Sequence, residues 1–163
     1  MNALRDLRML AIREALDEIV GADVLIATAL HALLDGVDSP SLPLLAGLSR
    51  REEGDAHDLF RAVVAELDLA PPAPIDAAIA RWHLVRWWCE AIADGTLEPE
   101  VAGHRIWFQG WNELGFPGSL QPLVGWVSEW EDWSPSWGVE RDHYRGLIVD
   151  EARRLLNGPW PPT

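Results

Sequence analysis

Apolar residues recur at intervals of three and four along almost the whole chain, which is the spacing that gathers side chains on one face of a helix. One such face consists of Leu59, Phe60, Val63, Val64 and Leu67. Between these segments, Ser49 and Glu52 have the spacing of a capping box, and Gly36 is placed as a helix stop. No segment alternates as a strand does. The pattern therefore predicts an all-α fold, a compact bundle of about six to seven helices.

The Pro-rich segment 71–74 divides the helical pattern into two parts. We expect the main helices at about residues 3–20, 22–35, 50–68, 75–94, 99–114, 120–132 and 138–156. Proline has no N–H to donate and disfavours helix at the residue before it, so the chain breaks at this segment. All ten tryptophans follow the break. We expect a helical N-terminal lobe over 1–70 and a Trp-rich helical C-terminal lobe over 75–163, together forming one compact domain.

The chain is strongly acidic, with 26 Asp and Glu against 13 basic residues, all of them Arg, and a net charge of −13. Nucleic-acid binding relies on cations that neutralise phosphates, so this balance argues against a nucleic-acid partner. It favours either a basic protein partner or simply solubility. Both interpretations stay open from charge alone.

The sequence carries no sign of export or of a membrane anchor. The N-terminal residues lack the apolar stretch and cleavage site of a signal peptide. The longest apolar run, 24–34, has 11 residues, whereas a helix needs about 20 to cross a bilayer. Cys89 is the single cysteine, so no internal disulfide can form. We therefore expect a cytoplasmic protein with no membrane partner.

Motifs for metal or cofactor chemistry are missing. A single Glu-x-x-His occurs, at Glu140 and His143, whereas di-iron bundles need two together with further carboxylates. There is no nucleophile elbow and no phosphate-binding loop. Cys89 lies on a mostly apolar helix, which is typical of an inert buried thiol. We predict no metal, no cofactor and no catalytic residue; an enzyme acting through Glu100 and His104 ranks lowest.

Three polar residues on otherwise apolar helix faces stand out. His104 shares helical spacing with Glu100 and with the rings of Trp107, Phe108 and Trp111. This edge is either an acid–base or ligand site or a boundary histidine paired with Glu100, and the pairing is favoured. Separately, Arg81 and Arg145 lie among apolar neighbours. We favour snorkelling or structural ion pairs for both over the binding of an anionic ligand.

The tryptophans are the main anomaly of the sequence. Packing in the core explains many of them, but indoles are rarely fully buried, and we expect some to be partly exposed. Residues 126–133, WVSEWEDW, combine indoles with carboxylates, which suits a cationic partner. The residues predicted to bind it are Trp126, Glu129, Trp130, Asp132 and Trp133. Gly103 and Gly110 are spaced to admit another helix or an indole.

Three C-terminal stretches resemble a recurring type of protein. They are EPEVAGHRIW (98–107), LQPLVGWVSEWEDW (120–133) and IVDEARRLL (148–156). Together they are similar to small acidic helical proteins of GC-rich bacteria that have no assigned function. The resemblance implies a helical fold and transfers no functional residue.

Two kinds of binding protein lead the functional hypotheses. The first is an acidic helical module that docks a basic protein, as an immunity protein, antitoxin or inhibitor does. The second is a small-molecule receptor with a Trp-lined pocket. The residues expected to line that pocket are Arg81, Trp88, His104, Trp107 and Trp111. Pairing of the apolar helix 22–35 with a second copy of the chain is a further option.

Overall fold

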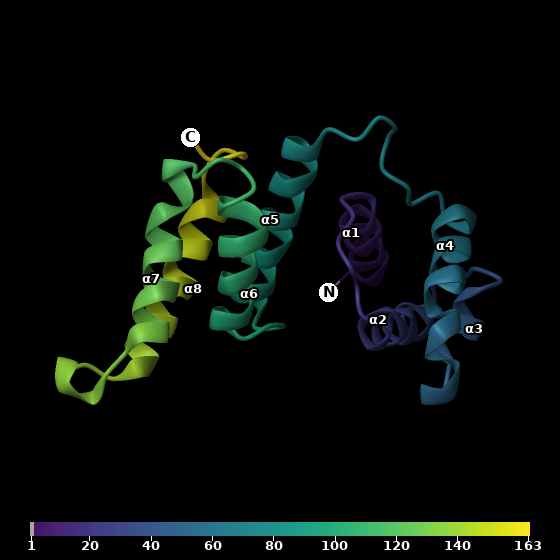
Figure 1. Cartoon of the computed structure of the whole chain (residues 1–163), viewed down its shortest axis with the longest axis horizontal. Coiled ribbons are helices and arrows are strands. Elements are labelled where there is room, and N and C mark those ends of the chain that lie inside the picture. The colour runs from purple at the N-terminus through teal and green to yellow at the C-terminus, as the bar shows by residue number, and fades with distance from the viewer. Residues whose placement is uncertain (1) are drawn as a thin grey trace. The chain divides into compact units, whose positions relative to one another are not determined.

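A computed structural model describes residues 2–163, and these residues contain helices and turns but no strand (Figure 1). The predicted all-α class is confirmed. Over the same residues there are eight α-helices, where six to seven were expected. The shortest is α3, Leu42–Ala46, in the Ser- and Pro-rich stretch, where the prolines indicated a turn and one short helix. The chain divides into two compact units, Met1–Asp76 and Ala77–Thr163, with the boundary just after the proline segment.

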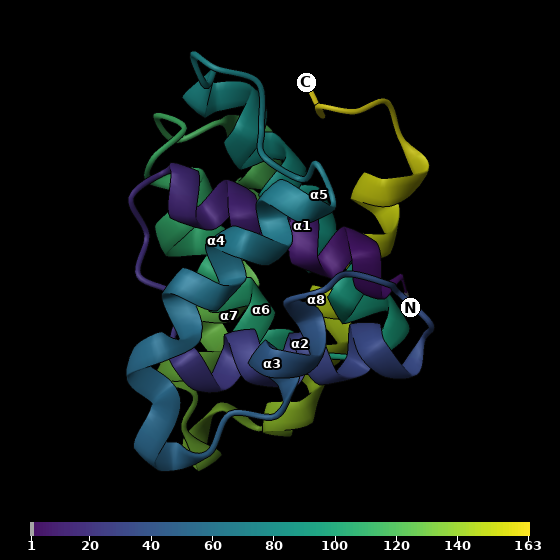
Figure 2. The same ribbon diagram turned by 90° about the vertical axis from the view of Figure 1, so that its right-hand side faces the viewer.

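In the first unit, three helices surround α2. The elements are α1 (Ala3–Ala15), α2 (Ala22–Leu34), α3, the 3-10 helix η1 (Arg50–Asp55) and α4 (Ala56–Glu66). Helix α2 packs against α1, α3 and α4, and its side-by-side arrangement with α3 is visible in Figure 2. The core side chains with no exposed surface include Leu7, Leu25, Leu42, Leu45, Phe60 and Val63. Leu30 and Leu34 of α2 remain exposed.

Helix α1 is shorter than the predicted span 3–20. It ends because Asp17 takes a positive φ of 62°, a left-handed conformation that stops an α-helix. The N–H of Glu18 then donates back to the carbonyl of Arg13 at 3.0 Å, and the side chains of these two residues form an ion pair at 3.0 Å. Val20 is buried although it lies beyond the helix, so its apolar spacing extended the prediction too far.

Polar contacts fix the remaining elements of this unit. The predicted capping box is confirmed, since the Glu52 carboxylate accepts from the Ser49 N–H at 2.9 Å and η1 begins there. The Glu66 carboxylate accepts hydrogen bonds from the hydroxyls of Ser39 and Ser41, which ties the loop before α3 to the end of α4.

The second unit is a set of helices that pack around one buried indole. Its main elements are α5 (Ala77–Asp94), α6 (Pro99–Arg105), the π-helix η2 (Ile106–Trp111), α7 (Gln121–Asp132) and α8 (Arg141–Asn157). Short 3-10 turns, η3 (Gly118–Leu120) and η4 (Pro135–Trp137), precede α7 and α8. Helix α8 packs against α5, α6 and α7. The fully buried residues include Leu84, Trp88, Ile106, Leu123, Val127, Ile148 and Ala152.

Two glycines let these helices approach closely, as predicted. A Cβ on Gly103 of α6 would lie 2.5 Å from a methyl carbon of Val127 on α7. A Cβ on Gly110 would lie 2.6 Å from a methyl carbon of Val85 on α5. Neither position can take a side chain unless the opposing valine or its helix shifts.

The single α-helix predicted over 99–114 is wrong in its second half. From Ile106 the hydrogen bonds lengthen to the π-helical pattern, and the Asn112 N–H donates to the carbonyl of Trp107 at 3.0 Å. Arg81 of α5 donates to the backbone carbonyl of Gln109 at 2.8 Å. One role of Arg81 is therefore to hold a carbonyl within the π-helix, which agrees with the structural interpretation of this residue.

Candidate functional site

The ten tryptophans differ in burial, and the expected partial exposure is confirmed. Trp88 is completely buried, Trp137 is 41 % exposed, and the other eight are half-buried. Trp160 turns back from the C-terminal tail to donate to the carbonyl of Trp82 at 3.2 Å. Two half-buried indoles, Trp126 and Trp130, lie on α7 together with the exposed carboxylates of Glu129, Glu131 and Asp132, so we take this helix as the candidate surface.

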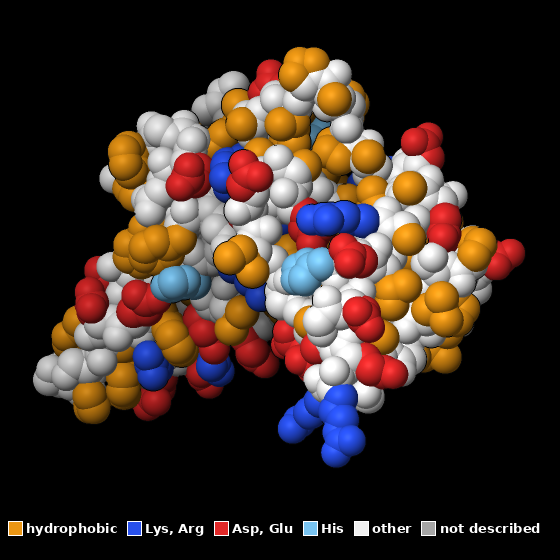
Figure 3. Space-filling model, turned by 45° about the vertical axis from the view of Figure 1, so that its right-hand side comes forward, with side chains coloured by type: hydrophobic (Ala, Val, Ile, Leu, Met, Phe, Trp, Pro, Cys, Tyr) orange, Lys and Arg blue, Asp and Glu red, His pale blue; other side chains and the backbone are white. Residues whose placement is uncertain are grey.

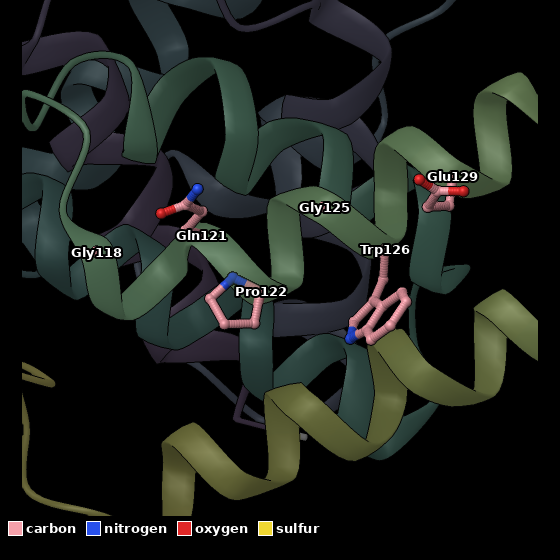
Figure 4. Close-up of a pocket in the computed structure, with 6 residues that line it drawn as sticks. All are labelled: Gly118, Gln121, Pro122, Gly125, Trp126 and Glu129. Carbon is pink, nitrogen blue, oxygen red and sulfur yellow. The ribbon is translucent and has the colours of Figure 1, made fainter.

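Helix α7 has one buried face and one open face. Leu123, Val124 and Val127 point into the core of the unit. The open face forms a shallow groove of about 400 Å³, lined by Gly118, Gln121, Pro122, Gly125, Trp126 and Glu129 (Figure 4). From Gln121 to Glu129 these positions fall on one face of α7, because they recur at helical spacing, and Gly118 adjoins them from η3.

Trp126 forms the wall of the groove that lies nearest α8. Figure 4 shows its indole extending toward α8, where its ring centroid lies 6.4 Å from that of Tyr144. Glu129 follows one turn later on the same helix, and its side chain is exposed. The groove therefore combines a half-buried indole with a solvated carboxylate.

Trp130 and Trp133 are already engaged by their own chain. The guanidinium carbon of Arg141 lies 3.7 Å from the Trp130 ring centroid, and that of Arg145 lies 5.6 Å from it. The Trp133 indole N–H donates to the carbonyl of Val139 at 2.8 Å. Of the predicted partner-binding indoles, Trp126 is thus the one that borders the groove.

The C-terminal end of α7 concentrates negative charge. Glu129, Glu131 and Asp132 are all exposed there, and the last turn of this helix contains no basic residue. Carboxylates are unfavourable at this end because the helix dipole is negative there. Acidic side chains are also widespread on the face drawn in Figure 3, where they lie among apolar ones.

The residues predicted to line a small-molecule pocket do not line this groove. Trp88 has no exposed surface, so a ligand cannot reach it without rearrangement of the core. Arg81 is bound to the Gln109 carbonyl. The Trp111 indole N–H donates to the carbonyl of Pro117 at 3.1 Å. Trp107 stacks on Phe108 with ring centroids 5.0 Å apart.

His104 and Glu100 have different partners. The favoured pairing of the two is replaced in the structure by an ion pair between Glu100 and Arg145, whose Nε donates to the carboxylate at 3.0 Å. This hydrogen bond raises the pKa of Arg145. The His104 ring lies 4.4 Å from that of Phe108, and its Nε2 is 3.5 Å from Glu131. The contact of His104 with Phe108 follows the predicted helical spacing, whereas Arg145 and Glu131 were missed because they come from α8 and α7.

The groove itself contains residues that sequence analysis did not single out. They are Gly118, Gln121, Pro122 and Gly125. The positions of the last three on the side of α7 opposite Leu123 and Val127 could have predicted the open face, because the apolar residues of a helix mark the face that is buried. Gly125 is the most informative of them. Among residues 2–163, no atom beyond its chain neighbours and its own helix backbone lies within 4 Å of where its Cβ would be.

Neither metal nor thiol chemistry has a visible centre in the described part of the chain. No three His, Cys, Asp or Glu side chains within residues 2–163 are grouped so that they could hold a metal ion. Burial raises the pKa of the Cys89 thiol to about 12, which keeps it protonated and unreactive. No helix among these residues is long and apolar enough to cross a membrane.

Comparisons of the chain with protein-family models, with curated proteins and with solved structures find no match. A function for this chain therefore has to be argued from the chemistry of the groove and its surroundings.

Proposed function

We propose that this protein docks a basic protein partner through the open face of α7, in the manner of an immunity protein, an antitoxin or another inhibitor. The observation that carries the proposal is the open groove beside Trp126, bordered by the carboxylates at the end of the same helix. The groove offers apolar area, and the carboxylates offer charge that a basic surface complements.

The electrostatics of α7 favour a cationic partner for a physical reason. Glu129, Glu131 and Asp132 add negative charge to the helix end that is already negative. Arg141 of α8 places one positive charge over this end, and a partner that brings further Lys or Arg relieves the repulsion that remains among the three carboxylates. The overall charge of −13 acts in the same direction, because it accelerates encounters with a basic protein at low ionic strength.

Trp126 supplies apolar contact area, which the carboxylates do not. Tryptophan is enriched among the residues that contribute most to protein interfaces, because it buries a large area with few rotatable bonds. Its half-buried indole is held against Tyr144, so little conformational freedom remains to be lost on binding.

The test is a capture experiment with charge-reversed variants of the full chain. Tagged wild-type protein is exposed to lysate of its source organism and washed at low and at high salt. The same is done with a Glu129→Lys, Asp132→Lys double variant. A matched control, Asp35→Lys with Asp38→Lys, makes the same change in net charge at exposed positions of the first unit.

The expected result is a basic protein that the wild type and the control retain at low salt and release at high salt, and that the α7 variant does not retain. Lysine at the end of α7 is favourable for the helix, so the variant should keep its helical circular dichroism. Equal retention by the α7 variant, or no protein retained specifically by the wild type, would contradict the proposal.

A further inference from the structure

We infer that the groove on α7 binds an arginine side chain of the partner, with the guanidinium against Trp126 and Glu129 and the partner's backbone crossing α7 at Gly125. This inference rests on the proposed function and specifies the chemistry that the partner must present. It follows from three observations: an internal precedent at Trp130, the geometry around Trp126, and the empty space over Gly125.

The precedent lies one helical turn further along α7. The Trp130 indole has the guanidinium of Arg141 at 3.7 Å and that of Arg145 at 5.6 Å. Arg145 is paired at the same time with Glu100, so indole, guanidinium and carboxylate are assembled together. This cluster shows that an indole on α7 attracts guanidinium groups: Arg141, which also donates to the Trp130 carbonyl, stacks on it, and Arg145, which Glu100 holds, lies farther from the ring.

Trp126 has the same elements except for the cation. It precedes Trp130 by four residues, and Glu129 lies three residues after it on the lining of the same groove. Tyr144 contacts the indole from α8. Within residues 2–163 no Arg lies over the Trp126 ring, so the indole and the carboxylate are available to a cation from outside.

Gly125 explains how a partner can come close enough. Glycine inside a helix is less favourable than alanine by about 1 kcal/mol. Gly103 and Gly110 have a packing role within this chain, because a Cβ on either would collide with a valine. At Gly125 a Cβ would meet open space, so the fold does not need glycine there. Without a side chain at this position of the groove lining, a partner backbone can lie closer to α7 than it could over alanine.

Arginine fits this groove better than lysine does. The planar guanidinium stacks on an indole face and can still donate two parallel hydrogen bonds to one carboxylate. Its aliphatic stem can lie along Pro122, which lines the apolar part of the groove. Lysine offers a point charge without the stacking surface, and citrulline offers the planar shape without the charge.

The test observes the Trp126 indole directly. Spectra of the ¹⁵N-labelled full chain resolve the indole N–H signals, and the Trp126→Phe variant identifies the one from Trp126. The protein is titrated with acetyl-Gly-Arg-Gly-amide and with the matching lysine and citrulline peptides. The Trp126 signal should move saturably with the arginine peptide. From the same signal, the protein should bind the lysine peptide at least about threefold more weakly than the arginine peptide. The signal should not move with citrulline.

Two variants locate the site on the groove. Glu129→Gln and Gly125→Ala should each weaken binding of the arginine peptide at least about threefold. Gly146→Ala is the matched control, because Gly146 is also an exposed glycine inside a helix with open space at its Cβ, but it lies on α8 outside the groove lining. This variant should bind the peptide as the wild type does.

The inference is overturned if the Trp126 signal does not move with the arginine peptide, if citrulline moves it equally, or if Gly125→Ala and Glu129→Gln bind as tightly as the wild type. Its failure can be separated from that of the proposed function. Capture of a basic partner that depends on Glu129 and Asp132, without any response at Trp126, removes the arginine groove and leaves the docking proposal standing. A specific response at Trp126 without a captured partner removes the docking proposal and leaves an arginine-binding groove on α7.

Discussion

The guanidinium carbon of Arg141 lies 3.7 Å from the centroid of the Trp130 indole, and its Nε donates to the backbone carbonyl of Trp130 at 3.0 Å. The first residue of α8 therefore covers the end of α7 in two ways. It stacks on an aromatic ring, and it brings a positive charge to the last turn of a helix that has none of its own there. This contact fixes the end of α7 beside which the groove opens.

Replacing Arg141 should weaken the second unit. Arg141→Gln removes the cation–π contact and the charge at the helix end, and we expect a loss of about 0.5–1 kcal/mol in the free energy of unfolding. The measurement is urea denaturation followed by circular dichroism. Arg153→Gln, an exposed position on the same helix, controls for the loss of one positive charge in an acidic protein. Equal losses in the two variants would mean that the Trp130 contact contributes nothing specific.

The glycines on the helices of the second unit should divide into two classes. Gly103→Ala drives a Cβ into Val127 and should cost about 1–3 kcal/mol of stability. Gly146→Ala meets open space and should add up to about 1 kcal/mol, because alanine favours the helix. Thermal and urea denaturation of the two variants measure both effects. A stabilising Gly103→Ala would show that α6 and α7 are not in the close contact described.

Stability should depend on pH through Glu66. Hydrogen bonds from Ser39 and Ser41 lower the pKa of this carboxyl below its usual value of 4.5. A folded-state pKa below the unfolded-state value means that the stabilisation is complete above about pH 4.5 and is lost as the pH falls through the folded-state value. The advantage of the wild type over Glu66→Gln should therefore shrink on acidification. Urea midpoints from neutral to acidic pH measure it, and an advantage that grew at low pH would contradict the hydrogen bonds.

Cys89 should report unfolding of the second unit. Burial raises its thiol pKa to about 12 and excludes reagents, so Ellman's reagent should label the native protein at least roughly a hundredfold more slowly than the urea-unfolded chain. The absorbance of the released thiolate gives both rates. Rapid labelling of one thiol per native chain would show that Cys89 is accessible and that α5 is not packed as described.

Local sequence signals predicted most of the helices. The end of α2 follows from Gly36, which takes a positive φ of 85° just after the helix, because stop signals depend on neighbouring residues. The end of α1 was misplaced because Val20 is buried from a loop and keeps the helical spacing beyond the helix. The π-helix was missed because the bonds in it depend on how α5 and Gly110 pack.

The candidate site was predictable only in part. Trp126 and Glu129, which line the groove, were singled out because indoles and carboxylates on one helix are visible in the sequence. The partners of Trp130, Glu100 and His104 come from other helices, and their choice depends on tertiary packing that spacing along one helix does not encode. The packing between helices also decides whether an arginine covers an indole or leaves it open to solvent.

The most direct test of docking through α7 is the affinity of the captured partner, measured by titration calorimetry at about 50 mM and about 500 mM salt. Charge complementarity predicts that affinity falls at least about tenfold at the higher salt concentration. At low salt, the Glu129→Lys, Asp132→Lys variant should bind at least about tenfold more weakly than the wild type, while Asp35→Lys with Asp38→Lys binds equally well. An affinity that is independent of salt and the same for all three proteins would contradict docking through the acidic end of α7.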